Sequence, residues 1–396
     1  MAIWHFLPDW STNVQVTYEF MTEIITSRAG KEQRIAKRDD PRLMIEYSTT
    51  VADRDLRATL GLLAADQDTM TLMADWVQPM SLAAAVSAGS TLVIVEDAEG
   101  WMRSTTGIIF VWEEDGRTRS ANSVISSRSG NNVTLTLSMP TDIPLHAHAY
   151  RMWTGHLNTS IGGSFAGDRM AEVKVIFDVD PGFENFAAIP AAPETYGGYE
   201  LLSLEPDWSR PFDAEFIGNL EVLDYGFGRK AFTRPVAFNS RLMKFGYMLD
   251  GRDEVDYFVN LFCRMSGQQG EFRMPTFTED LSLRSAASSG DTQIRVIGSD
   301  VAANFGSSTI YDAIVIFLMD GTRIMRTVSS MTPTGDDTLI DLTSTMPTVA
   351  LDDVDRISWM PVWRFASDQL VVQWETDQSA IVSLSLMTLE SLAPES

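Results

Sequence analysis

Apolar and polar residues alternate over a short stretch near the start of each half of the chain. The apolar positions are Val14, Val16, Tyr18 and Phe20 in the first half and Phe212, Ala214 and Phe216 in the second. Successive side chains of a β-strand point to opposite faces, so each stretch predicts a strand with one buried face. A similar alternation late in each half, at residues 173–179 and 382–386, predicts a strand that returns the chain to the same sheet.

An apolar stripe at helical spacing follows the first predicted strand in both halves. Its positions are Leu56, Thr59, Leu60 and Leu63 in the first half and Val255, Phe258, Val259 and Phe262 in the second. The i, i+3, i+4, i+7 spacing puts the side chains of each set on one face of a helix. The pattern predicts one amphipathic helix near residues 53–65 and another near residues 252–265, each packed across a sheet.

The segment after each predicted helix is rich in Ser, Thr, Gly and Val. It reads as short strands at residues 91–96 and 109–112 in the first half and at residues 292–297 and 314–318 in the second. Asp-Gly dipeptides at residues 115–116 and 320–321 predict hairpin turns, and Gly130 and Gly335 open a further turn in each set. Many short strands at this spacing predict a small closed barrel or sandwich within each half.

Short identities recur between the halves in the same order. The Pro-Asp-Trp-Ser sequence at residues 8–11 returns at residues 206–209, and the Arg-Leu-Met sequence at residues 42–44 returns at 241–243, with shifts of 198 and 199. Gly89 matches Gly290, and Met-Pro-Thr at residues 139–141 matches residues 346–348, with shifts of 201 and 207. A collinear series whose shift grows slowly indicates a duplication with a few loop insertions.

The predicted fold is mainly β, a tandem duplication of a β-sandwich-like domain with one packed helix, each copy carrying an inserted small β-barrel. Residues 181–205 contain Pro190, Pro193 and Gly197-Gly198, which is the composition of a linker. The predicted parts are a first core domain at 1–82 with 153–185, an inserted barrel at 83–152, a linker at 186–205, a second core domain at 206–284 with 361–390, and a second inserted barrel at 285–360.

The composition narrows the possible partners. The chain has 54 acidic and 30 basic side chains and a formal net charge of −24. Such a surface repels phosphate backbones, which argues against sequence-specific nucleic-acid binding through a basic groove. Its 396 residues, 44% of them apolar, are enough for two or three folded domains with a sizeable core.

Cysteine use and the absence of targeting signals predict where the chain folds. Cys263 is the single cysteine, so no internal disulfide forms and the fold suits a reducing cytoplasm. The N-terminal residues lack the basic start and apolar core of a signal peptide, and no apolar run reaches the roughly 18 residues that a membrane helix needs. We therefore expect synthesis and assembly in the host cytoplasm and no membrane partner.

One segment resembles a known family. Residues 22–34 read TEIITSRAGKEQR and are followed by Pro41-Arg42, a predicted helix and an aromatic-containing strand. Over residues 14–80 this pattern resembles the distal tail proteins of long-tailed, non-contractile phages and gene transfer agents. The resemblance implies a β-sandwich with one helix that assembles as a ring under the tail tube, with small decorating β-barrels. The family usually has one copy of the domain, and the second copy here retains only Gly228 and Arg234 of the Gly30 to Arg34 portion, having lost Glu-Gln.

Candidate metal ligands form two groups. His146, His148 and His156 are close in sequence and could share a metal on one strand face, but no cysteine lies near and a first-row metal takes a fuller ligand set. Clustered carboxylates occur at residues 336–337 and 352–355, but they lack the mid-loop Gly and distal Glu of a Ca²⁺-binding EF-hand. Hydrogen-bonded surface histidines and solvated acidic loops are the favoured interpretations, so we predict no metal and no cofactor.

Enzyme motifs are absent from the sequence. It has no Gly-x-Ser-x-Gly elbow, no Gly-Lys-Ser/Thr phosphate loop and no Rossmann glycine pattern after a strand. A carboxylate pair for glycoside hydrolysis leaves no fixed spacing in sequence, so a cell-wall-degrading tail enzyme stays open as a third possibility. We predict no catalytic residues and no enzymatic activity.

Tryptophan is abundant, and two of the ten tryptophans occupy matching positions. Trp10 and Trp208 both lie in a Pro-Asp-Trp-Ser setting, which favours a corner where the chain enters a sheet over an interface anchor. Exposed Trp on the inserted barrels would instead favour a receptor- or carbohydrate-binding tail protein.

The sequence and the resemblance together predict a structural virion protein of the phage tail tip, distal-tail or baseplate-like. It would form a ring that joins the tail tube to tip or hub proteins, and it would self-associate as a homotrimer or homohexamer.

Overall fold

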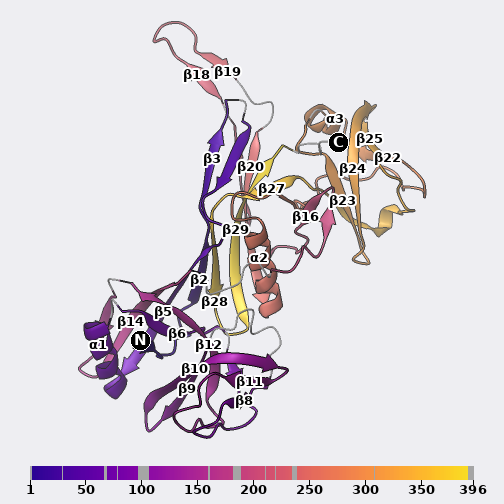
Figure 1. Ribbon diagram of the computed structural model, residues 1–396. Coiled ribbons are helices and arrows are strands. Elements are labelled where there is room, and N and C mark those ends of the chain that lie inside the picture. The colour runs from indigo at the N-terminus through magenta and orange to yellow at the C-terminus, as the bar shows by residue number, and fades with distance from the viewer. Residues whose placement is uncertain are drawn as a thin grey trace.

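The computed structural model describes residues 2–28, 30–66, 69–77, 79–96, 107–158, 161–181, 189–209, 211–218, 220–233, 239–306 and 308–390. The fold is mainly β, as the sequence predicts. We call residues 2–181 the first half and residues 189–390 the second half. In Figure 1 a long central sheet lies between two smaller groups of strands, one from each half.

The first half is built around β5 (Arg42–Ala52). This strand pairs antiparallel with β2 (Val14–Glu19) on one side and with β14 (Met170–Val179) on the other. Leu43, Ile45 and Tyr47 of β5 are buried, and the residues between them are partly exposed. This is the period-two pattern of a strand with one face on the core. The same alternation over Val173, Val175 and Phe177 buries one face of β14, as predicted.

Further strands complete the first half. They are β1 (Ala2–Trp4), β3 (Thr22–Thr26), β4 (Glu32–Ala36), β6 (Thr71–Ala74), β12 (His148–Leu157) and β13 (Gly163–Phe165). β1 lies parallel to β6, β6 pairs with β12, and β12 and β13 both pair with β14.

A buried hydrogen-bond cluster lies in the core of the first half. The indoles of Trp4 and Trp76 donate to the Tyr47 hydroxyl over 2.7 and 2.9 Å. Burial raises the pKa of Tyr47 far above its ordinary range.

The first inserted segment forms a closed circuit of strand pairings. Its strands are β7 (Met80–Ser81), β8 (Leu92–Ile94), β9 (Gly107–Glu114), β10 (Arg117–Ser129) and β11 (Asn132–Leu135). Pairing runs from β8 through β11, β10, β9 and β12 to β7, and a bridge between Leu82 and Val95 joins the two ends. Asp115 and Gly116 have φ angles of 51° and 65°, so the Asp-Gly signal forms the two-residue β9–β10 turn that the sequence predicts.

The second half has strands in a matching order. They are β15 (Thr195–Tyr196), β16 (Tyr199–Leu201), β17 (Asp213–Ile217), β18 (Glu221–Leu223), β19 (Ala231–Thr233), β20 (Ser240–Asp250), β21 (Phe272–Arg273), β27 (Val362–Phe365), β28 (Gln369–Trp374) and β29 (Ser379–Leu389). β16 lies parallel to β21, β21 pairs with β27, β27 and β28 pair with β29, and β29 and β17 pair with β20. Each of these pairings has a counterpart in the first half.

The second inserted segment repeats the closed circuit. Its elements are β22 (Gln293–Ile297), α3 (Asp300–Phe305), β23 (Ala313–Leu318), β24 (Arg323–Thr334), β25 (Asp337–Leu342), η2 (Leu351–Asp353) and β26 (Val354–Trp359). Pairing runs β22–β25–β24–β23–β26, and bridges from Leu281 to Ile357 and from Leu283 to Val296 join the ends. The bridge between Leu82 and Val95 in the first half becomes Leu283 to Val296 here, a shift of 201 at both ends.

Backbone hydrogen bonds in the loops repeat as well. The amide of Asp9 donates to Ser48 O over 2.8 Å, and that of Asp207 donates to Gly246 O over 2.9 Å, with both residues shifted by 198. The amides of Gly89 and Gly290 donate to the carbonyls of Met139 and Met346 over 2.8 and 2.9 Å. The φ angles of these two glycines are 85° and 94°, a conformation that L side chains rarely adopt, which explains why glycine recurs at this turn.

The helices cover the central sheet to different degrees. α2 (Arg252–Arg264) buries Val255, Phe258, Val259 and Phe262, so the predicted apolar stripe is confirmed. α1 (Asp53–Asp66) buries Leu56 and Thr59, but Leu60 is 42% exposed, because this helix packs mainly on β5, β10 and β14 at the edge of its half. Figure 1 shows α2 against the middle of the molecule and α1 at its periphery.

The core of the described residues divides into one large cluster, one cluster in each inserted segment, and a small fourth cluster where Leu201 meets the second inserted segment. The large cluster contains buried side chains from both halves, including Trp4, Phe177, Phe245 and Trp363. Each inserted segment encloses a cluster of its own, around Phe110 in the first and Trp359 in the second. The large cluster is removed from water only when both halves are folded, so the two halves stabilise each other.

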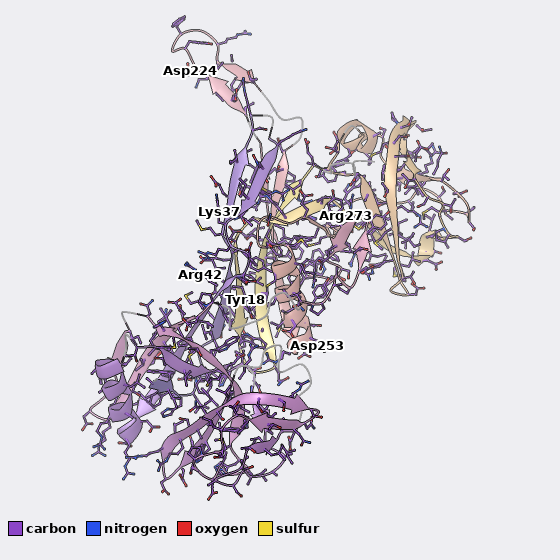
Figure 2. All side chains as sticks on the ribbon, viewed as in Figure 1. Tyr18, Lys37, Arg42, Asp224, Asp253 and Arg273 are labelled. Carbon is purple, nitrogen blue, oxygen red and sulfur yellow. The ribbon has the colours of Figure 1, made fainter. Side chains whose placement is uncertain are left out.

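Arg273 anchors the second inserted segment to the second half. Its guanidinium makes a two-bond ion pair with Asp312, at 2.9 and 2.8 Å, and donates to Met360 O over 2.7 Å. Figure 2 shows Arg273 between the central sheet and the second inserted segment. In the first half the attachment is different, since β12 runs without a break from the inserted segment into the core. In the second half Pro361 separates β26 from β27, because proline lacks the N–H that a strand ladder needs.

Two sequence-based expectations are wrong. The sequence predicts a linker at residues 186–205, but within the part that the structure describes β15 and β16 lie there, with Leu201 and Leu202 buried. Residues 182–188 lie outside the described residues. β16 joins a parallel pair as β1 does, so it is the first strand of the second half with a counterpart in the first half. The stretch at residues 212–216 forms β17 as expected, but every residue of this strand is exposed.

Candidate assembly interface

The two halves are joined by a β-strand pairing, which we call the seam. β2 of the first half pairs antiparallel with β28 of the second over six residue pairs, from Val14 with Trp374 to Glu19 with Gln369. On the core face Val14, Val16, Val372 and Trp374 are all buried. Through this pairing the sheets of the two halves become one, in the order β14–β5–β2–β28–β29–β20–β17.

Two ion pairs reinforce the seam, with Arg364 buried and the Arg34–Glu271 pair partly buried. The Arg364 guanidinium donates two hydrogen bonds of 2.8 Å to the Glu32 carboxylate, and Arg34 pairs with Glu271. Glu32 and Arg34 lie on β4 of the first half, whereas Glu271 and Arg364 belong to the second. A bidentate Arg–carboxylate contact is directional, so it fixes the position of one half on the other. Glu32 and Arg34 belong to the segment that carries the family resemblance.

The Asp368 carboxylate ties the start of β3 to the second half. Its Oδ2 accepts the Thr22 amide over 2.6 Å, and its Oδ1 accepts the Thr22 hydroxyl and the Gln268 amide, both over 2.9 Å. One side chain thus satisfies donors from both halves. The ring of Phe20 also packs on that of Phe262, with centroids 5.5 Å apart. These contacts place β3 firmly beside the second half.

A second group of charges lies beneath the seam. Arg151 donates to Asp75 from Nε and Nη2 over 3.2 and 2.8 Å, and both side chains are buried. Arg252 of α2 lies over the Trp374 ring, 5.0 Å from its centroid. Burial lowers the pKa of the Arg252 guanidinium, and the carboxylates of Asp75 and Asp256 oppose this shift. All of these side chains line one small pocket between the halves, so the seam has charged as well as apolar contacts.

The joined sheet ends in two edges that pair on one side only within the described part of the chain. β17 pairs only with β20, and β13 pairs only with β14. Phe216 of β17 is 63% exposed and Phe165 of β13 is 62% exposed. An unpaired strand presents a row of N–H and C=O groups to any other strand that can reach it.

Two hairpins project from the same end of the molecule. They are β3–β4 from the first half and β18–β19 from the second, and Figure 1 shows them at the top of the view. The hairpin of β18 and β19 exposes an apolar set: Leu220, Val222, Leu223, Tyr225, Phe227 and Phe232. Figure 2 shows Asp224 out on this hairpin and Lys37 at the base of the other. Exposed apolar side chains in a contiguous group are typical of a contact surface.

The histidines do not form a metal site in the part of the chain that the structure describes. His148 and His156 lie at opposite ends of β12, and His156 faces Asp180 with 3.7 Å between Nε2 and Oδ1. His146 contacts the carbonyl of Glu113 at 3.4 Å. No group of three or more His, Cys, Asp or Glu side chains able to hold a metal occurs among the described residues.

The acidic clusters serve as structural ion pairs or turns. Asp337 pairs with Arg284 and Arg295, and these contacts lower the pKa of its carboxyl, the Arg284 hydrogen bonds contributing most. Asp352 and Asp353 lie in the short 3-10 turn η2. Among the described residues neither cluster belongs to a group of three or more side chains that could hold a metal ion such as Ca²⁺.

The matching tryptophans occupy matching corners. Asp9 accepts the Ser11 amide and Asp207 accepts the Ser209 amide, over 3.0 and 2.9 Å, so the two Pro-Asp-Trp-Ser sequences turn in the same way. Trp208 is 49% exposed and stacks on Phe212 at 4.5 Å, next to β17. On the inserted segments Trp112 and Trp359 are buried, and Trp101 lies outside the described residues.

Nothing in the sequence points directly to the seam or to the two open edges. Strand pairing between residues about 350 positions apart leaves no local pattern. The one signal was the alternating stretch at residues 212–216, because β17 stays exposed along its whole length although it pairs with β20. Arg234, expected to match Arg34, lies outside the described residues. In the hairpin β18–β19 Phe232 pairs with Val222, and in β3–β4 Arg34 pairs with Ile24. By its place in the hairpin, the counterpart of Arg34 is therefore Phe232.

No protein-family model matches this chain, and no curated protein matches it in sequence. Among the described residues, no helix is both long and apolar enough to span a membrane.

Proposed function

We propose that this chain is a structural protein of the phage tail tip, distal-tail or baseplate-like, which forms a ring joining the tail tube to tip or hub proteins. It works by shape and contact and has no catalytic turnover. We propose that its two halves are copies of one ring-forming domain, each with an inserted β-barrel. The observation that carries the proposal is the seam, because it joins the halves edge to edge and leaves the same two kinds of edge open at the ends of the sheet.

The repeated order of pairings supports the duplication. Every core pairing of the first half has a counterpart in the second, including the unusual parallel pair β1–β6 with β16–β21. The similarity of residues 22–34 to distal tail proteins supports the tail-tip assignment, and Glu32 and Arg34 of that segment lie in the contact between the halves. In this proposal the same contact that joins domains in a ring joins the halves of one chain.

The projecting hairpins support docking to another virion protein. The apolar side chains of β18–β19 lie far from the core, and Phe227 is 85% exposed. A protein with a formal net charge of −24 stays soluble in spite of such a surface, because copies repel one another until a specific contact forms. We assign this hairpin to the tail tube or to the hub, with assembly in the host cytoplasm and final location in the virion.

Immunogold labelling of intact particles with an antibody against this chain tests the proposal. We expect gold at the tail end distal to the head, and the same label on tail tubes purified from cells that lack head assembly. Label along the whole tail or on the head, or no label on particles that contain the gene, would contradict a tail-tip role. Cleavage of cell-wall polymer by the purified chain in a zymogram would contradict the absence of catalysis.

A further inference from the structure

The open edges of the sheet correspond to the two strands that form the seam. β17 pairs with β20 as β2 pairs with β5: Val16 faces Ile45, and Ala214 faces Met243, so both partners shift by 198. β13 pairs with β14 as β28 pairs with β29: Ser164 faces Glu172, and Gln373 faces Ile381, so both partners shift by 209. Among the described residues, therefore, the second half lacks a partner for its version of β2, and the first half lacks one for its version of β28.

We infer that β17 of one chain pairs antiparallel with β13 of a second copy of this chain, in the register of the seam. Val14 faces Trp374 in the seam. Adding 198 to the first number and subtracting 209 from the second places Phe212 opposite Phe165. The same arithmetic places Ala214 opposite Gly163 and Phe216 opposite Ile161. An added strand forms main-chain hydrogen bonds with an open edge, and its alternate side chains give specificity.

The side chains of the two edges fit each other in this register. A pair of small residues, Ala214 and Gly163, lies between two pairs of large apolar ones, which are Phe212 with Phe165 and Phe216 with Ile161. Cross-strand pairs of aromatic and apolar side chains are favourable. On the other face Asp213 meets Ser164, so no like charges oppose each other at that position in spite of the acidic composition. This fit also explains why the apolar face of β17 is exposed in the single chain.

The ion pair between Arg34 and Glu271 in the seam has an apolar counterpart in the inferred contact between chains. In the seam Arg34 pairs with Glu271. The counterpart of Arg34 is Phe232, by the shift of 198 in the hairpins. The counterpart of Glu271 is Met70, because Phe272 matches Thr71 in the parallel pairs, a shift of 201. Phe232 and Met70 are both exposed, so an ion pair within the chain corresponds to an apolar pair between chains.

The inferred contact is head to tail, since it joins two different strands. Repeated contacts of this kind close into a ring when the rotation per copy divides a full turn. If each half occupies one of six positions, three chains close the ring, as in the homotrimer form of the proposed function. The inference deepens the self-association in that proposal, but the strand contact itself needs no tail to be measured.

Cysteine trapping in the full chain tests the contact. Asp213→Cys and Ser164→Cys are made as single variants, because both residues are exposed and directly opposed in the inferred register. Opposed residues on paired strands have Cβ atoms about 4.5–5.5 Å apart, within reach of a short thiol-to-thiol reagent. Cys263 is buried, which keeps background reaction low. We expect a mixture of the two variants to give a two-chain product, and each variant alone to give little.

Matched variants separate the possible outcomes. The control variant is Ser129→Cys, at an exposed position of the first inserted segment. Mixed with Asp213→Cys in place of Ser164→Cys, it should give no two-chain product. Adding Phe216→Asp to Asp213→Cys should lower the yield about tenfold, because it puts a charge at the centre of the contact. Absence of product in the mixture, equal product with Ser129→Cys, or stronger product from Asp213→Cys alone would overturn the inferred pairing.

The double variant with both cysteines in one chain then tests closure. We expect discrete covalent species that end at three chains. A ladder without an upper limit would leave the pairing in place and contradict the ring of the proposed function. Failure of immunogold labelling at the tail tip would contradict the tail role and leave the strand contact untouched, so the two claims can fail separately.

Discussion

β2 and β17 have the same place in the two halves but different surroundings. Both pair with the central strand of their half, β5 or β20, and both carry an apolar face. In β2 this face is buried because β28 covers the next edge of the sheet, whereas all of β17 is exposed. The difference teaches that an alternation of apolar residues predicts a strand but does not say whether its apolar face is buried within the same chain.

The largest expected effect comes from removing an aromatic ring from the seam. Trp374→Ala should lower the free energy of unfolding by about 3–5 kcal/mol, because the side chain is 2% exposed and leaves a cavity between the halves. Its counterpart Phe165→Ala should change the stability of the single chain by no more than about 0.5 kcal/mol. Urea denaturation of both variants measures the difference. Equal losses of stability would contradict the account, in which Trp374 is buried in a contact within the chain and Phe165 lies at an open edge.

The ion pair across the seam should have the next largest effect. Arg364→Met leaves the Glu32 carboxylate without its two-bond partner, at a cost of roughly 3 kcal/mol for a buried pair. The double variant with Glu32→Gln should recover part of this loss, since no charge is then left unpaired. Arg28→Met is the control: the Arg28–Glu221 pair joins the two hairpins in solvent, so thermal unfolding should not change measurably. A loss for Arg28→Met as large as for Arg364→Met would contradict this assignment.

A smaller effect concerns pH and lies outside the seam. Burial lowers the pKa of His5 from its ordinary value of 6.5. The folded chain therefore holds this imidazole neutral, while the unfolded chain takes up a proton as the pH falls through that value. The folded state therefore keeps its full stability relative to the unfolded state above pH 6.5 and loses part of it as the pH falls below that value.

The His5→Gln variant checks this sign. Its melting temperature should fall less than that of the parent chain between about pH 7.5 and pH 5.5. Carboxylates with lowered pKa, such as Glu19, lose their contribution only at more acidic pH and do not interfere in this window. An identical slope for both proteins would show that His5 is not the titrating group.

The smallest effect is expected for metal removal. EDTA should leave the melting temperature of the parent chain unchanged, and the double variant His146→Ala with His148→Ala should behave in the same way, because these side chains lie apart from a full ligand set. Elemental analysis provides the second readout. Near-stoichiometric zinc, nickel or iron that disappears in the double variant would contradict the prediction.

Local patterns predicted the elements of each half. The stripe of α2, the alternation of β14 and the Asp-Gly turn after β9 depend on residues a few positions apart, so the sequence determines them directly. The linker assignment failed because Leu201 and Leu202 are flanked by Pro and Gly, and their burial depends on the parallel partner β21 some 70 residues later. The candidate interface could not be predicted, since β2 meets β28 only after the whole chain has folded.

A cryo-EM reconstruction of the assembled tail tip tests the central claim most directly. We expect this chain to form a closed ring at the junction with the tail tube, with β17 of each copy hydrogen-bonded to β13 of the next and Phe216 of one chain beside Ile161 of its neighbour. A ring of three chains would place six similar domains around the axis, and six chains would place the halves in two layers. A chain present once per particle, an open helical array along the tube, or a ring in which β17 and β13 both stay unpaired would contradict the account.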